Sequence, residues 1–122
     1  MMFREVLASI VDPTPGALAA AVMGSDGIPI DEYRRDEDPL DLDTVAVEFQ
    51  RVLEQATKVA TALYGPGGGE LEELVLRTAA HQLLFRQVDD DYFVVIALAP
   101  GGMMGKARYL LRSVLHKLRQ EL

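Results

Sequence analysis

The 122-residue sequence contains no cysteine and no tryptophan, and it has only two histidines. Without cysteine there is no disulfide framework, thiol nucleophile or thiolate metal site. The longest unbroken apolar runs, at 17–23 and 93–99, are much shorter than the roughly 20 residues that a membrane-spanning helix needs. The first residues also lack the basic, apolar and cleavable regions of a signal peptide. We therefore expect a cytoplasmic protein with a single domain over residues 1–122.

Positive charge is scarce as well, because 12 lysines and arginines face 19 acids and give a net charge of −7. This argues against nucleic acid as a partner, since phosphates demand a basic face, and equally against an acidic membrane surface. The charge is uneven along the chain. Residues 31–43 hold seven acids and two arginines, whereas 106–119 hold five basic residues and no acid. The ordinary interpretation of such a one-sided basic helix is a solvated face.

The spacing of apolar residues predicts the order of the elements. Helical spacing is found in three stretches: 2–11, 41–65 and 106–122. Strands are predicted in five shorter stretches: 16–23, 28–33, 70–79, 82–88 and 92–99. Tight turns at Asp26-Gly27 and at 89–91 make neighbouring strands antiparallel. The sequence therefore predicts an α+β fold with helices on a five-stranded antiparallel sheet.

The pattern within the elements predicts their places in the fold. The strands at 16–23 and 92–99 are apolar on both faces, so we expect them at the centre of a three-layer sandwich. Pro29 cannot donate to a strand ladder, which places its strand at an edge. Asp41 is a candidate N-cap of the long helix, and Asp43 is placed in the first turn. One apolar stripe of that helix comprises Leu42, Val45, Phe49, Leu53, Ala56, Ala60 and Leu63.

A glycine loop, APGGMMGKAR at 99–108, stands between the last strand and the last helix. A phosphate-binding loop of the Walker type requires G-x-x-x-x-G-K-[ST]. Here Pro100 replaces the first glycine, and Ala107 replaces the hydroxyl that binds magnesium. We favour a turn in which Gly105 packs where a side chain would obstruct. A nucleotide-binding enzyme that uses residues 101–106 is the minor alternative.

Other catalytic and metal-binding patterns are weak. His81 falls at a predicted turn and His116 on the polar side of the last helix, and no serine lies in a G-x-S-x-G context. The three aspartates at 89–91 lack the spaced oxygen ligands of a calcium loop and are interpreted as a hairpin turn. We therefore expect no catalytic, cofactor-binding or metal-ligating residues, and a protein that is not an enzyme.

Two surface features remain. Val47 lies roughly opposite the apolar stripe of the long helix, near Arg51, Glu54 and Lys58; it is either a tolerated exposed valine or part of a partner-binding patch. The strand at 70–79 is a predicted edge that carries four apolar side chains: Leu71, Leu74, Val75 and Leu76. An apolar edge invites aggregation unless it is paired, and self-pairing in a two-fold dimer would solve this.

Three stretches carry a family resemblance: GALAAAVMGSDGIPI (16–30), LDTVAVEFQRVLEQA (42–56) and DDDYFVVIALAPGGMMGKARYLLR (89–112). Together they resemble the Roadblock/dynein light-chain domain family, particularly its bacterial MglB-like members. The resemblance implies the strand order 2-1-5-4-3, with the first and third helices on one face of the sheet and the second on the other. It also implies a homodimer in which the third strands pair and the second helices lie side by side. Placed on this sequence, that interface holds Leu71, Leu74, Val75, Leu76, Val52 and Val59.

The resemblance further implies a non-enzymatic regulator of a Ras-like small GTPase of the MglA type, as in bacterial cell polarity. The partner is expected over the face of the second helix, which holds Val47, Arg51, Glu54, Gln55 and Lys58. The alternative is a scaffold that joins signalling or cytoskeletal proteins without changing GTP hydrolysis. MglB-like proteins have an additional C-terminal segment, whereas this sequence ends at Leu122. GTPase binding or scaffolding is therefore a safer expectation than activation.

Overall fold

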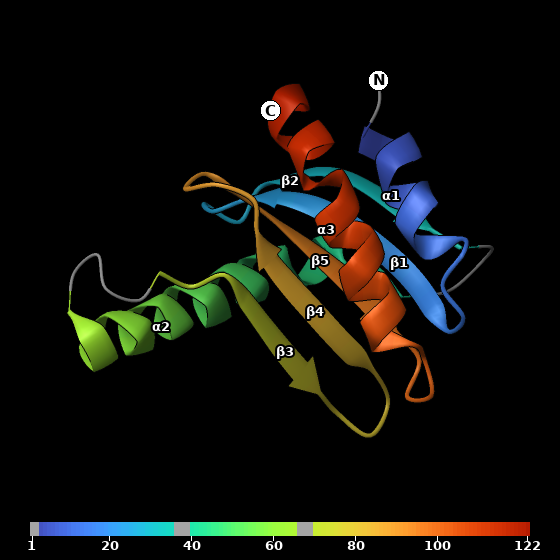
Figure 1. Ribbon diagram of the computed structural model, residues 1–122. Coiled ribbons are helices and arrows are strands. Elements are labelled where there is room, and N and C mark those ends of the chain that lie inside the picture. Colours follow the sequence, from blue (N-terminus) through green and yellow to red (C-terminus); the bar gives the residue numbers. More distant parts are fainter. Residues whose placement is uncertain (1–2, 36–39, 66–69) are drawn as a thin grey trace.

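The computed structural model describes residues 3–35, 40–65 and 70–122 (Figure 1). Its elements follow the predicted order of helix, two strands, helix, three strands and helix. In chain order they are α1 (Phe3–Val11), β1 (Ala17–Gly24), β2 (Pro29–Arg34), a 3₁₀ turn η1 (Asp43–Val45), α2 (Ala46–Tyr64), β3 (Glu73–Arg77), β4 (Gln82–Gln87), β5 (Tyr92–Leu98) and α3 (Met104–Glu121). No helix in this part of the chain combines the length and the apolar character needed to cross a membrane.

The five strands form one sheet in the order β2-β1-β5-β4-β3, with every neighbouring pair antiparallel. This confirms the predicted α+β fold and strand order. Pro29 begins the edge strand β2, where its missing N–H costs no ladder bond. β5 lies at the centre with β1 beside it, and both are almost entirely buried because their side chains are apolar on both faces.

Two apolar cores separate the three layers of the sandwich. On one face, α1 and α3 pack over Ala20, Val22, Leu84 and Ile96. On the other face, α2 packs over a second set of strand residues: Ala19, Ala21, Met23, Phe85, Phe93, Val95 and Ala97. The alternation of alanines along β1 supplies small side chains to both cores, which lets helices approach the central strand closely. The predicted assignment of the helices to the two faces is therefore confirmed.

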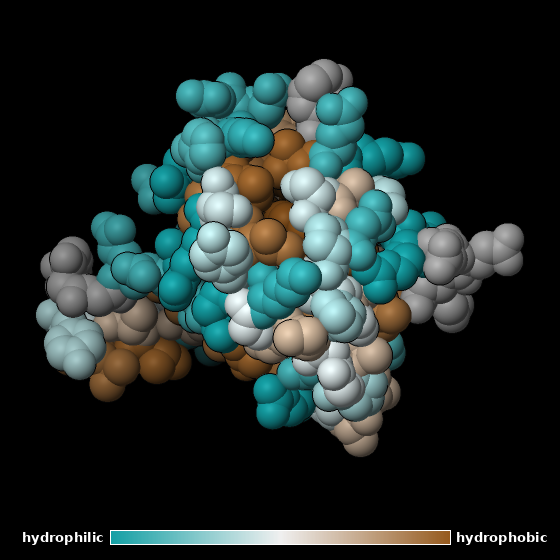
Figure 2. All heavy atoms as spheres, turned by 45° about the vertical axis from the view of Figure 1, so that its right-hand side comes forward, coloured by the Kyte–Doolittle hydropathy of each residue, from teal (hydrophilic) through white to brown (hydrophobic). Residues whose placement is uncertain are grey.

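Helix α2 is attached to the sheet through its first half only. Its buried residues are Ala46, Phe49 and Leu53, and the rings of Phe49 and Phe85 meet edge to face at 5.1 Å. The predicted apolar stripe continues to Leu63, but that side chain is 69% exposed. The stripe therefore loses its cover in the second half of the helix, because the helix extends past the sheet (Figure 1). Figure 2 shows apolar atoms gathered at this projecting end, where Val59 and Leu63 are exposed.

Two boundaries differ from the sequence prediction for identifiable reasons. The long helix begins at Ala46 rather than at residue 41, because η1 precedes it. Asp41 therefore does not cap α2; its Oδ1 accepts the N–H of Asp43 at 3.1 Å in front of the 3₁₀ turn. Similarly, β3 spans Glu73–Arg77 only, so Leu71 lies outside the strand that was predicted to contain it.

The glycine loop connects β5 to α3, as predicted, but Gly105 is not its tightly packed glycine. A side chain at Gly105 would have nothing within 4 Å. A Cβ at Gly102 would instead lie 2.9 Å from Cβ of Leu98. The loop is held from below by the side-chain amide of buried Gln82, which donates to the carbonyls of Ala99, Pro100 and Gly102 at 3.0, 3.1 and 3.2 Å.

Candidate partner-binding site

The outer face of α2 is exposed at all five positions where GTPase contacts are predicted. Val47 is 54% exposed, which places it on the surface as expected. Arg51 pairs with Glu48 at 3.2 Å, and Lys58 pairs with Glu54 at 3.6 Å. Exposed ion pairs of this kind contribute little to stability, so their side chains can exchange partners at small cost. This face therefore presents one apolar side chain, that of Val47, among charged side chains that can change their partners.

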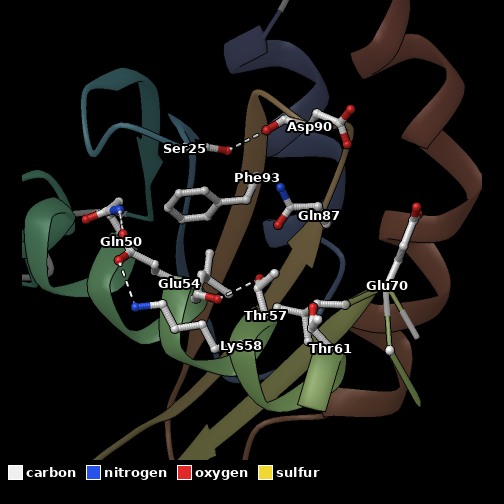
Figure 3. A pocket seen from close by; sticks show the side chains of 13 residues that line it. Ser25, Gln50, Glu54, Thr57, Lys58, Thr61, Glu70, Gln87, Asp90 and Phe93 are labelled. Atoms are coloured by element: carbon white, nitrogen blue, oxygen red, sulfur yellow. Dashed lines mark hydrogen bonds and ion pairs between the residues drawn. The ribbon is translucent and has the colours of Figure 1, made fainter. Parts of the chain in front are cut away.

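A cavity of about 520 Å³ lies between the second half of α2 and the adjacent end of the sheet (Figure 3). Its walls come from α2, the β1–β2 turn, the β4–β5 hairpin and the chain that leads into β3. The lining residues are Ser25, Gln50, Leu53, Glu54, Thr57, Lys58, Thr61, Gly65, Glu70, Leu71, Gln87, Asp90 and Phe93. Of the predicted GTPase contacts, the structure therefore brings Glu54 and Lys58 to the cavity and leaves Val47, Arg51 and Gln55 outside it.

The cavity has an apolar base and a polar rim. Leu53 and Phe93 are buried beneath it, while Glu54 accepts the amide of Gln50 at 2.8 Å and pairs with Lys58 (Figure 3). The hydroxyl of Thr57 donates to the carbonyl of Leu53 at 2.9 Å and is thus used inside the helix. Among the lining residues no hydroxyl faces a histidine that could activate it. This arrangement suits the reception of a partner's side chain.

The predicted dimer residues divide between two faces of the sheet. Leu74 and Leu76 lie on the α2 face, where they are half-buried against their own core opposite Phe85 and Leu83. Val75 points to the other face and is 39% exposed. Leu71 lines the cavity, whereas on α2 Val52 is half-buried and Val59 is 59% exposed. β3 has a single strand neighbour in the described sheet, so its outer edge is open to pairing.

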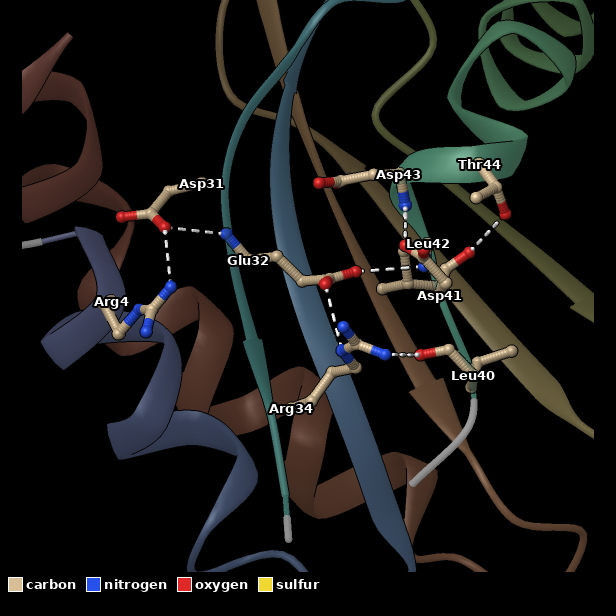
Figure 4. Close-up of polar contacts among 9 residues, drawn as sticks. All are labelled: Arg4, Asp31, Glu32, Arg34, Leu40, Asp41, Leu42, Asp43 and Thr44. Carbon is tan, nitrogen blue, oxygen red and sulfur yellow. Dashed lines mark hydrogen bonds and ion pairs between the residues drawn. The ribbon is translucent and has the colours of Figure 1, made fainter. Parts of the chain in front are cut away.

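A second polar cluster joins β2 to the start of α2 (Figure 4). One oxygen of Glu32 accepts the N–H of Leu42 at 2.9 Å, and the other pairs with Arg34 at 3.2 Å. The carboxylates of Glu32, Asp41 and Asp43 approach so closely that one oxygen of each lies within 4.8 Å of the others. Oxygen ligands of this type suit a hard divalent cation. Both oxygens of Glu32 nevertheless have protein partners, which gives the cluster a structural role at this junction.

Burial and the same crowding raise the pKa values of two carboxyl groups, those of Glu32 and Asp43. Burial raises the pKa of Glu32 above its ordinary value, although the hydrogen bond from Leu42 acts in the opposite direction. Burial also raises the pKa of Asp43, and the neighbouring charge of Asp41 adds to the effect. Both shifts follow from placing carboxylates close together at a partly desolvated junction.

Sequence reasoning missed both the cavity and the junction. The cavity residues Ser25, Thr61, Gln87, Asp90 and Phe93 come from separate elements and share no spacing that would link them. In the sequence the acid-rich stretch 31–43 stands out only as a run of charge. The hydrogen bond from the N–H of Leu42 to Glu32 depends on how the start of α2 is placed beside β2, and no local sequence pattern encodes that placement.

Comparison with solved structures relates this architecture to known proteins. MglC from Myxococcus xanthus is 39% identical over the whole of both chains, with a TM-score of 0.70. The gliding protein MglB from Thermus thermophilus is 19% identical, with 91% of this chain and 81% of that chain covered and a TM-score of 0.78. An MglB described with a tetrameric arrangement is also 19% identical, at 95% and 84% coverage and a TM-score of 0.83. The two MglB structures support the fold alone.

Comparison by sequence gives the family directly. No protein with a curated description matches the chain. The family model of the Roadblock/LC7 domain matches residues 4–97, which is most of the chain and includes α2, the first four strands and all of β5 except Leu98. This match, together with the identity to MglC, confirms the resemblance expected from the sequence. The chain belongs to the Roadblock/LC7 domain family.

Proposed function

We propose that this protein is a non-enzymatic homodimer that binds a Ras-like small GTPase of the MglA type through the outer face of α2. Family membership supports the general role, because this chain resembles MglB-like Roadblock proteins, and these regulate such GTPases. The observation that carries the proposal is the uneven burial of α2. Its first half is anchored by Ala46, Phe49 and Leu53, while its second half has no fully buried residue.

The two flanks of α2 suit two different partners. On one flank Val52, Ala56, Val59 and Leu63 recur at 3–4 spacing and pass from half-buried to exposed. Such an apolar flank is costly to leave in water, and a second copy of the helix would cover it. The other flank combines Val47 with charged side chains, which is typical of surfaces that bind and release a partner. We therefore assign the first flank to dimerisation and the second to the GTPase.

The chemistry on the GTPase side is positioning. Arg51 is the only arginine among the predicted contacts, and it lies on the exposed face of a helix rather than on a projecting loop. An arginine finger must reach into the GTPase site and meet the transferred phosphate. We therefore infer that binding orients the catalytic groups of the GTPase itself. A protein that binds in this way without changing the hydrolysis rate would be a scaffold.

The test uses a purified GTPase of the MglA type with the full chain. Affinity is measured by titration in the GTP-bound and GDP-bound states, and hydrolysis is followed with and without this protein. We expect nucleotide-dependent binding that Val47→Glu weakens about tenfold or more, because a carboxylate would replace the apolar contact. Tyr109→Glu, at a 70% exposed position on α3 and thus on the opposite face of the sheet, serves as the control. Absence of binding to the GTPase in both nucleotide states would contradict the proposal, whereas binding without faster hydrolysis would support the scaffold.

A further inference from the structure

Four arginines gather on the face of the sheet that lies opposite to the proposed GTPase site. Arg86 lies on β4, and Arg108, Arg112 and Arg119 lie along one side of α3. We call this group the arginine cluster. In Figure 1, α3 crosses this face with β4 and β3 emerging beside it. The chain as a whole carries a charge of −7, so a concentration of cations at one place requires an explanation.

Arg86 is the most buried member of the cluster, and no close carboxylate balances its charge. Its side chain is only 16% exposed, and its Nε has no hydrogen-bond partner. The paired carboxylate, that of Glu72, is 3.9 Å from Nη1 and 78% exposed. Glu73 lies directly opposite Arg86 in the sheet, but both of its oxygens accept from Nε of Arg108, at 2.9 and 3.1 Å. A buried cation that lacks a close anion is unfavourable unless another group supplies one.

The helix arginines extend this site into a line. Arg108 is fixed at Glu73, and Nε of Arg119 donates to the carbonyl of Val88 at 3.0 Å, two residues beyond Arg86. These two contacts hold α3 against β3 and against the end of β4. Arg112 lies one turn after Arg108, is exposed, and pairs with none of the carboxylates in the described chain. From Arg108 to Arg119 the helix rises about 16 Å, at about 1.5 Å per residue.

We propose that the arginine cluster binds an acidic segment of a partner protein, in which alternate Asp or Glu side chains lie along α3 and one carboxylate reaches Arg86. An extended chain covers about 16 Å with about five residues, so a short run of acids matches the line of cations. Planar guanidinium groups bind carboxylates in pairs of hydrogen bonds, which favours this ligand. A single small anion would leave most of the line unoccupied. The site is independent of GTPase binding, because it occupies the opposite face.

The test is fluorescence anisotropy with the full chain and a labelled peptide that contains about five consecutive glutamates. A peptide with glutamines at the same positions is the control, and inorganic phosphate and a single-stranded oligonucleotide are tested as competitors. Arg112→Gln removes the exposed arginine of the line that pairs with no carboxylate in the described chain. Lys117→Gln removes an equal charge from the other flank of α3, about 140° around the helix, and serves as the matched variant.

We expect the glutamate peptide to bind in low salt and the glutamine peptide not to bind. Arg112→Gln should weaken binding about fivefold or more, because a charge-assisted hydrogen bond is lost, whereas Lys117→Gln should change it less than about twofold. Arg86→Gln should weaken it as well; if that variant does not fold, Arg112→Gln alone decides. Equal effects of the Arg112 and Lys117 variants would overturn the proposal. So would tight binding of the glutamine peptide, or tighter binding of the oligonucleotide or phosphate than of the glutamate peptide.

Discussion

The exposed end of α2 gives the sharpest test of the proposed dimer. Val59 is 59% exposed and Leu63 is 69% exposed, and both lie on the apolar flank of the helix. Full burial of a Val or Leu side chain contributes about 1.5–3 kcal/mol, so covering these exposed parts is worth about 1 kcal/mol for Val59 and about 1.5 kcal/mol for Leu63. A two-fold interface buries each residue twice. The pair therefore contributes about 5 kcal/mol to dimerisation.

The double substitution Val59→Glu and Leu63→Glu removes this contribution and adds repulsion between carboxylates. We expect the dissociation constant to rise by about three orders of magnitude or more. The fold of the protomer should be retained, because neither side chain is buried within it. Sedimentation velocity over a range of concentrations measures the oligomeric state, and circular dichroism verifies the fold.

Val47→Glu is the matched control for the dimer experiment. It makes the same chemical change on the same helix at a similar exposure of 54%, but on the other flank. This variant should remain dimeric at concentrations where the double variant is monomeric. If the double variant associates as strongly as the unmodified chain, α2 is not part of the dimer interface and the reasoning from its burial is refuted.

Three further predictions concern the fold and its junctions. Phe49→Ala should lower the free energy of unfolding by about 3–4 kcal/mol in urea titrations, because it removes the edge-to-face contact with Phe85 beneath α2. The control Tyr109→Ala, at an exposed site, should change the free energy of unfolding by less than about 0.5 kcal/mol. Gly16→Ala should lower the free energy of unfolding by about 2 kcal/mol or more in the same assay, because Gly16 has a φ of 82° and a Cβ there would collide with Cα of Gly102. The control Gly105→Ala should leave the free energy of unfolding unchanged or raise it. The raised pKa of Glu32 means that its contribution to stability is fully present below the ordinary Glu pKa of about 4.3 and is lost as pH rises through the raised folded-state pKa. The stability of the unmodified chain relative to Glu32→Gln should therefore fall as the pH rises above the ordinary Glu pKa, and a flat or rising difference would contradict this sign.

The fold was predictable because its main determinants are local and repetitive. Apolar runs on both faces of β1 and β5 require two covering layers, and the Asp26-Gly27 turn requires an antiparallel hairpin. Asp26 and Gly27 act there as predicted, with Oδ1 of Asp26 accepting the N–H of Ile28 at 3.0 Å and Gly27 at a φ of 88°. Pro29 was a reliable edge marker because a missing N–H is tolerated only there. These features need no knowledge of distant contacts.

The errors arose where distant contacts decide the outcome. Gly105 and Gly102 look equivalent in the sequence, but only Gly102 lies against Leu98, because the loop folds back over β5. Asp41 has the residue type of a helix N-cap, yet a 3₁₀ turn precedes the helix, and the N–H of Leu42 before that turn donates to Glu32 of β2, a contact between segments that no local pattern predicts. The helical wheel of α2 predicts which side chains are apolar. It carries no information on where the sheet beneath the helix ends.

That last point connects dimerisation to partner binding. The second half of α2 supplies Glu54, Thr57, Lys58 and Thr61 to the cavity wall, but within one protomer only the first half is anchored. A second copy that covers Val59 and Leu63 would hold this half in place and so fix the cavity and the adjacent charges. Loss of the dimer should therefore also weaken GTPase binding, although neither Val59 nor Leu63 lies on the GTPase flank. Equal GTPase affinity for the monomeric double variant and the dimer would show that the first half of α2 alone carries the site.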